Sequence, residues 1–234
     1  RFKPPFPATF GLYGQPTTVN NTQTLASVPK ILEKGHEWYA SMGSEKSPGT
    51  VIFSVSGHVN NPGNFELPLA IPFDVLLDKA GGVIEGKKLK AVIPGGSSTK
   101  ILKADVISKC TMDYESLQDA GSALGTGAVV VIAEGTCMVN LLKRISRFYY
   151  AENCGQCSPC REGTGWLYKI LHRITQGQSS LNDLSLLVDI AGKIEGTTIC
   201  AFGDASAWPV QSFIENYYEE FEYMVKNHGK SIAA

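Results

Sequence analysis

The spacing of hydrophobic residues divides the chain into three stretches with different periods. Residues 22–42 carry apolar side chains at the three- and four-residue steps of an amphipathic helix, with a first turn ahead of Pro29. From residue 50 the period changes to two, as in strands. From about residue 136 the helical period returns and continues to residue 227. The pattern predicts a helix, then a mainly β region, then a helical region.

The middle stretch is predicted to form a small α+β domain. The alternating segment 50–59 and the segment 65–69 flank the turn cluster NNPGN, which predicts a β-hairpin. A single short helix is expected at 73–82, where the segment ends in glycine. Further strands are expected at 90–96 and 125–135, because both are short apolar runs beside glycine or proline. Strands, one helix and more strands are typical of an α+β domain.

The last stretch is predicted to form a bundle of four helices joined by short polar links. The four helical segments are 138–154, 162–177, 180–196 and 209–227. In the second helix we expect five apolar side chains to share the face that packs on the core. These side chains are Trp166, Leu167, Ile170, Leu171 and Ile174.

Composition and charge exclude several classes of partner. The 234 residues are 43% hydrophobic and carry 21 basic against 22 acidic side chains. A nearly neutral chain without runs of like charge does not favour nucleic acid or an anionic membrane as partner. No apolar run approaches the roughly 18–20 residues of a membrane-spanning helix, so we expect no direct membrane insertion. The start, RFKPPFPATF, lacks both a signal-peptide core and a methionine, so we expect a piece of a longer polypeptide.

The cysteines carry the clearest chemical signal. Cys154, Cys157 and Cys160 form a C-x2-C-x2-C run, and Cys200 follows much later. Such a run can wrap three corners of a 4Fe-4S cube and leave the fourth iron to a distant cysteine. Zinc more often takes two spaced pairs, and a triplet cannot form disulfides without one cysteine left over. A 4Fe-4S cluster is therefore favoured, with zinc and a disulfide framework as alternatives.

Residues near the cysteines add detail to this hypothesis. Cys110 and Cys137 stand alone, and we interpret them as cysteines without a metal. Gly155 would let the backbone approach the cluster sulfides, and Pro159 would stiffen the loop just before a helix. Arg161 would place a positive charge beside an anionic cluster and raise its reduction potential. The alternative for Arg161 is an ordinary solvated first helical turn.

Four sequence motifs resemble those of one known family. They are LYGQPTTVNNTQTLASV, AVIPGGSS, ENCGQCSPCREGTGW and IEGTTICAFGDASAWPVQ, and the similarity runs from residue 1 to about residue 223. Together they resemble the flavoprotein subunit of respiratory complex I, the F subunit family of NADH-quinone oxidoreductases. The same superfamily includes the diaphorase subunits of NAD-linked hydrogenases and formate dehydrogenases, which remain an alternative.

The resemblance implies a fold, a function and a set of site residues. The fold would be α+β multidomain: the end of a Rossmann-like FMN/NADH domain at 1–44, a ubiquitin-like β-grasp domain of SLBB type at 45–135, and a four-helix bundle carrying the cluster at 136–234. The function would be hydride transfer from NADH to FMN, followed by single-electron transfer through a 4Fe-4S cluster toward quinone. The implied cluster ligands are Cys154, Cys157, Cys160 and Cys200. The implied FMN and NADH contacts are Lys3, Phe6, Val19, Asn20, Asn21 and Thr24.

The implied nucleotide site has a simpler alternative. Asn20 and Asn21 are also typical turn residues, and Phe6, which would stack on an NADH ring, is also typical of a packing anchor. The family's glycine-rich phosphate loop does not occur in this sequence. Neither PGGSS nor GTGAV replaces it, because neither is expected between a strand and a helix. The alternative function is an electron-relay or docking module without its own flavin site.

The resemblance also implies partners and a location. The partners would be other peripheral-arm subunits of complex I, especially a thioredoxin-like 2Fe-2S subunit and the large multi-cluster subunit. The location would be cytoplasmic, peripheral to the inner face of the membrane, or on the matrix side in mitochondria. We expect no catalytic side chain, because the flavin itself carries the hydride chemistry.

Overall fold

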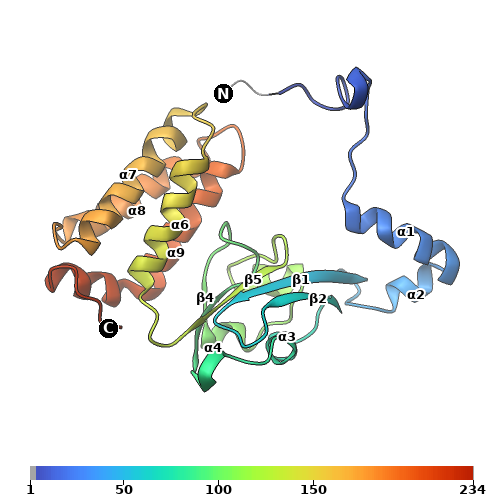
Figure 1. The fold of residues 1–234 in the computed structure, drawn as a ribbon, viewed down its shortest axis with the longest axis horizontal. Coiled ribbons are helices and arrows are strands. Elements are labelled where there is room, and N and C mark those ends of the chain that lie inside the picture. Colours follow the sequence, from blue (N-terminus) through green and yellow to red (C-terminus); the bar gives the residue numbers. More distant parts are fainter. Residues whose placement is uncertain (1–3, 234) are drawn as a thin grey trace.

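The computed structural model describes residues 4–233 and contains three parts (Figure 1). The N-terminal part holds α1 (Thr22–Lys34) and α2 (His36–Ala40), the middle part holds a twisted sheet with short helices, and the C-terminal part is a helical bundle. This order agrees with the three periods of the sequence. Across residues 4–233 no helix combines the length and the apolar character needed to span a membrane.

The sheet is mixed, and its strands lie in the order β2-β1-β5-β3-β4. Its first two strands form the predicted antiparallel hairpin, and β1 also pairs in parallel with β5 at the centre. The strands expected at 90–96 and 125–135 are confirmed as β3 and β5. The strands are β1 (Thr50–Gly57), β2 (Gly63–Pro68), β3 (Leu89–Ile93), β4 (Leu102–Lys103) and β5 (Ala128–Ala133).

The expected helix of the middle domain is confirmed as α3 (Phe73–Lys79). The prediction of a single helix was wrong, because α4 (Ala104–Ile107) and α5 (Tyr114–Asp119) are also present. Helices of four to six residues complete fewer than two turns, so they leave no hydrophobic period in the sequence. Two 3₁₀ turns lie at Leu12–Gly14 and Ile84–Gly86.

The two faces of the sheet are buried against different partners. Val92 and Val131 pack on one face with Phe73 of α3. Their neighbours Ile93 and Ile132 point to the other face and belong to the core of the helical bundle. This alternation follows from the two-residue period of a strand. The β domain and the bundle therefore share a continuous hydrophobic core.

The predicted four-helix bundle is confirmed, although two of its helices begin earlier than expected. The helices are α6 (Met138–Glu152), α7 (Ser158–Thr175), α8 (Asn182–Ile194) and α9 (Phe202–Lys226). Pro159 lies in the first turn of α7 rather than before it, where its missing N–H leaves no hydrogen bond unmade. Pro209 lies inside α9 rather than at its start. Pro159 therefore marks the beginning of α7, ahead of the predicted start at residue 162, whereas Pro209 does not mark the beginning of α9.

The prediction that Trp166 faces the core was wrong, since its side chain is 53% exposed. The other four residues predicted for this face of α7 are buried. Successive residues of an α-helix are turned by about 100°. Trp166 therefore lies about 100° around the helix from Leu167, at the edge of the buried face.

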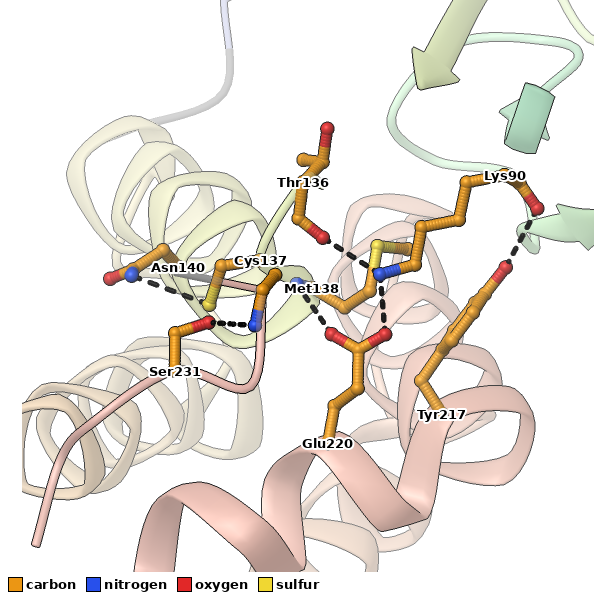
Figure 2. Close-up of polar contacts among 9 residues, drawn as sticks. Lys90, Thr136, Cys137, Met138, Asn140, Tyr217, Glu220 and Ser231 are labelled. Carbon is orange, nitrogen blue, oxygen red and sulfur yellow. Dashed lines mark hydrogen bonds and ion pairs between the residues drawn. The ribbon is translucent and has the colours of Figure 1, made fainter. Parts of the chain in front are cut away.

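A polar joint also connects β3 to the bundle (Figure 2). The Lys90 ammonium donates to the Thr136 carbonyl over 2.8 Å and forms an ion pair with Glu220 of α9. The Glu220 carboxylate also accepts the Met138 N–H at 3.3 Å, and the Tyr217 hydroxyl donates to the Lys90 carbonyl at 3.2 Å. Both charged side chains of the ion pair are largely buried, with 16% and 14% exposed.

The N-terminal helix forms as predicted but ends earlier. About two turns of α1 precede Pro29, and Gly35, with φ of 89°, separates α1 from α2. The apolar side chains Leu25, Val28 and Leu32 remain exposed. The apolar face of α1 is therefore left uncovered by residues 4–233.

Candidate metal centre

Four cysteines lie at one end of the bundle. Cys154 follows the end of α6, Cys157 directly precedes α7, and Cys160 lies in the first turn of α7. Cys200 lies just before the start of α9. Because helices α6 to α9 run up and down in turn, the end of α6, the start of α7 and the start of α9 fall at the same end (Figure 1). The topology thus brings the triplet and the remote cysteine together.

A direct contact joins the two cysteine segments. The Ile199 N–H donates to the Cys157 sulfur at 3.4 Å. Burial first, and then the neighbouring Cys154, Cys157 and Cys200, raise the pKa of the Cys160 thiol to about 11. The four thiols therefore share one electrostatic environment. An iron or zinc ion would have to displace the Cys160 proton in order to bind there.

The four thiols can be compared with what a single ion and a cluster each require. Among residues 4–233 no disulfide forms, and no three cysteine, histidine, aspartate or glutamate side chains converge on one ion position. A zinc ion with sulfurs at about 2.3 Å needs them roughly 3.8 Å apart. A 4Fe-4S cube holds its thiolates farther apart, since each binds a different iron. The chemistry of the four thiols fits such a cluster.

Arg161 spans the loop between the first two cysteines. Its guanidinium donates to the Gly155 carbonyl at 2.9 Å and to the Ser158 hydroxyl at 3.4 Å, and it pairs with Glu162 at 2.9 Å. Gly155 has a φ of 81°, a conformation that glycine adopts without strain. Arg161 is therefore not only a solvated charge, because its hydrogen bonds stabilise the turn between Cys154 and Cys160.

A second set of contacts holds the buried end of the triplet. The Thr164 hydroxyl donates to the Cys160 carbonyl at 2.7 Å, and the Asn153 amide donates to Thr164 at 3.4 Å. Thr164 is almost completely buried. These bonds connect the residue before Cys154 to the first turns of α7.

The Cys200 segment is held by carboxylates that the sequence analysis missed. The Glu195 carboxylate accepts from the Trp208 indole at 2.6 Å and from the Gln211 amide at 2.8 Å. These two hydrogen bonds, Gln211 first, hold the pKa of Glu195 below its ordinary value. Asp204 accepts from the Gly196 N–H at 2.7 Å. All these residues occur within the motif IEGTTICAFGDASAWPVQ. No regular spacing predicts their hydrogen bonds, because each bond joins residues that are far apart in the sequence.

A close backbone approach completes this segment. The Thr198 hydroxyl donates to the Cys200 carbonyl at 2.8 Å. A Cβ atom placed on Gly203 would lie only 2.3 Å from the same hydroxyl oxygen. Glycine at this position therefore leaves room for the bond that fixes the Cys200 backbone.

The other two cysteines lie away from the four. Cys137 precedes the opposite end of α6, and the 15 residues of this helix span about 22 Å. Its sulfur accepts a hydrogen bond from Asn140 at 3.4 Å. Cys110 is buried in the β domain, where its thiol donates to the Val106 carbonyl at 3.3 Å and burial raises its pKa.

The residues expected to contact FMN and NADH do not all lie in one place. Lys3 lies outside the described residues. Phe6, Val19 and Asn20 line one open cavity of about 590 Å³. The Asn21 side chain instead caps α1, since it accepts the N–H groups of Gln23 and Thr24 at 2.9 and 3.2 Å. This cap is the turn role that the sequence offered as the alternative.

Neither glycine-rich segment forms a phosphate loop within residues 4–233. PGGSS, residues 94–98, joins β3 to β4, and GTGAV, residues 125–129, leads into β5. Neither leads from a strand into the start of a helix, as a phosphate loop does. The described residues thus offer an open cavity without a phosphate loop, and a complete FMN pocket does not fit them.

Comparison with protein families divides the chain in the same way as the fold. The family model described as an SLBB domain matches residues 52–132. The model described as the NADH-ubiquinone oxidoreductase-F iron-sulfur binding region matches residues 140–224, which include the four cysteines. The chain therefore contains an SLBB domain followed by a helical region that matches this iron-sulfur binding region.

Curated relatives give a closer identification. The F subunit of NADH-quinone oxidoreductase from Rickettsia bellii (strain OSU 85-389) is 47% identical over 228 residues, and that from Rickettsia typhi is 47% identical over 231 residues. The alignments cover 97% and 98% of this chain and 55% of each relative. The chain spans about half the length of these relatives. It is a homologue of the F subunit of NADH-quinone oxidoreductase.

Solved structures show a similar fold in another enzyme. The air-oxidized NAD⁺-reducing [NiFe]-hydrogenase contains a chain that matches with a TM-score of 0.83 and 29% identity. The H₂-reduced form matches with a TM-score of 0.82 and 30% identity. Each match covers 96% of this chain and 38% of the hydrogenase chain.

Proposed function

We propose that this chain binds one 4Fe-4S cluster through Cys154, Cys157, Cys160 and Cys200. The observation that carries the proposal is the meeting of the triplet and the Cys200 segment at one end of the bundle, with the Ile199 N–H on the Cys157 sulfur. A bound cluster of this type supplies one-electron transfer. The ligand set is consistent with the iron-sulfur family match over residues 140–224.

The surrounding residues have separable tasks in this proposal. The N–H groups at the starts of α7 and α9 point a partial positive charge toward an anionic cluster. The buried Cys160 keeps one side of the site away from water, while Cys154 and Cys200 are exposed. The exposed side is where an electron donor or acceptor can approach closely. Arg161 holds the loop and adds a charge that Glu162 partly offsets.

For a protein with the full length of the curated relatives we propose electron entry from NADH through FMN toward quinone, as homology to the F subunit of NADH-quinone oxidoreductase suggests. Phe6, Val19 and Asn20 would form part of the nucleotide-binding wall. Lys3 and Thr24 are assigned to the same wall by resemblance. Asn21 is assigned there too, although its side-chain oxygen already caps α1. This chain alone is then a cluster-bearing relay module.

The finer domain assignment is also a proposal. Residues 1–44 would end a Rossmann-like FMN/NADH domain, 45–135 would form a ubiquitin-like β-grasp domain, and 136–234 would carry the cluster. The strand order β2-β1-β5-β3-β4 with a parallel central pair supports the β-grasp assignment. The proposed partners are peripheral-arm subunits of complex I, among them a 2Fe-2S subunit and the multi-cluster subunit, on the inner side of the membrane.

A diaphorase subunit of an NAD-linked hydrogenase or formate dehydrogenase is the second candidate. The structural match to the NAD⁺-reducing hydrogenase favours it. The sequence identity to complex I relatives is higher, at 47% against 29–30%. We therefore place complex I first.

Metal and flavin analysis of the purified chain tests the proposal. The chain is isolated without oxygen, and iron, sulfide, zinc and FMN are measured beside the visible spectrum. We expect about four irons per chain and no FMN. Stoichiometric FMN would contradict the relay assignment for this chain, and zinc in place of iron would contradict the cluster.

A further inference from the structure

The loop PGGSS, residues 94–98, has no part in the site described above, although it reaches the helical bundle. The Thr99 hydroxyl donates to the Gly96 carbonyl at 3.0 Å and accepts the Gly95 N–H at 3.2 Å. A Cβ atom on Gly95 would lie 2.5 Å from two backbone carbonyl oxygens. A loop held this tightly fixes the place of Ser97.

Ser97 contacts a buried tyrosine in the last turn of α6. Its hydroxyl lies 3.1 Å from the Tyr149 hydroxyl. Tyr149 is only 4% exposed. This hydrogen bond connects the β domain to the bundle at the end that carries the four cysteines.

Tyr149 also contacts both cysteine segments. Its ring meets Phe202 edge to face, with centroids 5.3 Å apart, and Phe202 begins α9 two residues after Cys200. Its carbonyl accepts the Asn153 N–H at 3.1 Å, and Asn153 directly precedes Cys154. Tyr149 thus contacts the segment that carries the remote cysteine through its ring, and the segment that carries the triplet through its backbone.

We propose that Tyr149, anchored by Ser97, is a positioning residue that sets the separation of Cys200 from the Cys154–Cys160 triplet. The inference rests on the proposed cluster ligation. A cube requires four sulfurs at fixed separations, whereas the two segments reach the site from different helices. The hydroxyl bond fixes the tyrosine ring, and the ring fixes the start of α9. The β domain thereby contributes to the geometry of the cluster.

The test compares variants of the full chain loaded with the cluster. Tyr149→Phe keeps the ring and loses the bond to Ser97, and Ser97→Ala loses the same bond from the other side. We expect each to release iron to a chelator about three- to tenfold faster, and to shift the EPR g values of the dithionite-reduced chain. The double variant should release iron no faster than either single variant, because both remove one interaction.

Two further variants serve as controls. Ser97→Thr keeps a hydroxyl and should retain the wild-type rate and spectrum. Tyr168→Phe removes a hydroxyl that makes no hydrogen bond within residues 4–233, and it should have no effect. Tyr168 stacks on Tyr150, with ring centroids 6.1 Å apart, and it lies on the same bundle.

Several results would overturn the inference. Wild-type iron release in Tyr149→Phe or Ser97→Ala would do so, as would additive effects in the double variant. A lower unfolding midpoint of the metal-free chain with an unchanged EPR spectrum would show a purely structural role. Four irons retained in Cys200→Ser would instead refute the proposed ligand set, whatever the Tyr149 variants show.

Discussion

Side chains from other helical turns hold each cysteine segment of the candidate metal centre in place. The spacing of Cys154, Cys157 and Cys160 was enough to predict an iron-sulfur site from sequence. The same spacing could not show that Glu195 fastens the Cys200 segment, because its contacts depend on how α8 and α9 meet. Local chemistry was predictable, and tertiary hydrogen bonds were not.

Gly203→Ala should loosen the Cys200 segment. The new methyl group would collide with the Thr198 hydroxyl and displace its bond to the Cys200 carbonyl. We expect the free energy of unfolding to fall by roughly 1–3 kcal/mol and the iron content to fall with it. Chemical denaturation and iron analysis measure both. Gly192→Ala in α8 meets no atom within 4 Å and should gain roughly 0.5–1 kcal/mol; equal losses in the two variants would contradict the steric argument.

Glu195 should make stability depend on pH in the acid range. Its pKa is lowered in the folded chain, so its ionised form stabilises the fold above its ordinary pKa of 4.5. The contribution is lost as pH falls through the lowered pKa. We therefore expect wild type to exceed Glu195→Gln in unfolding free energy near neutral pH, with the difference shrinking below about pH 4.5. Urea titrations of the metal-free chain measure this, and a difference independent of pH would argue against it.

The elements were predicted well where they are long and periodic. All four bundle helices and the hairpin follow from their hydrophobic spacing. The starts of α7 and α9 did not follow, because α7 begins at Ser158, one residue before Pro159, and α9 continues for seven residues ahead of Pro209. The short helices α4 and α5 could not be predicted, since neither completes two turns. The exposure of Trp166 shows that the limits of a buried face depend on neighbouring helices.

The ion pair between Lys90 of β3 and Glu220 of α9 offers a test at the scale of secondary-structure elements (Figure 2). Lys90→Met leaves the largely buried Glu220 without its cation, and we expect a loss of roughly 2–4 kcal/mol in unfolding free energy. Lys90→Met combined with Glu220→Leu should recover much of this loss, because no unpaired charge remains. A double-mutant cycle by chemical denaturation measures the coupling.

An exposed ion pair provides the control for this joint. Lys193 and Asp189 pair on α8 with 75% and 53% of their side chains exposed. Lys193→Met should cost less than about 0.5 kcal/mol. If Lys90→Met lowered the free energy of unfolding by as little as this, the Lys90–Glu220 ion pair would not stabilise the contact between the domains.

The whole molecule joins an SLBB domain and an iron-sulfur bundle through one shared core. The sequence predicted both domains but not that the sheet forms one wall of the bundle core. Periodicity shows which residues are buried, and it does not show against which element. The shared core and the Lys90 contacts hold the β domain against the bundle, and the Ser97 contact reaches the end of the bundle that carries the four cysteines.

Iron analysis and EPR of Cys200→Ser beside Cys137→Ser test the central claim most directly. Both substitutions exchange one sulfur for oxygen, but Cys200 lies at the four-cysteine end of the bundle and Cys137 about 22 Å of helix away from Cys154. We expect Cys200→Ser to give a labile or three-iron species and Cys137→Ser to keep the wild-type iron content and spectrum. An unchanged iron content and spectrum in Cys200→Ser would contradict the assignment of Cys200 as the fourth ligand.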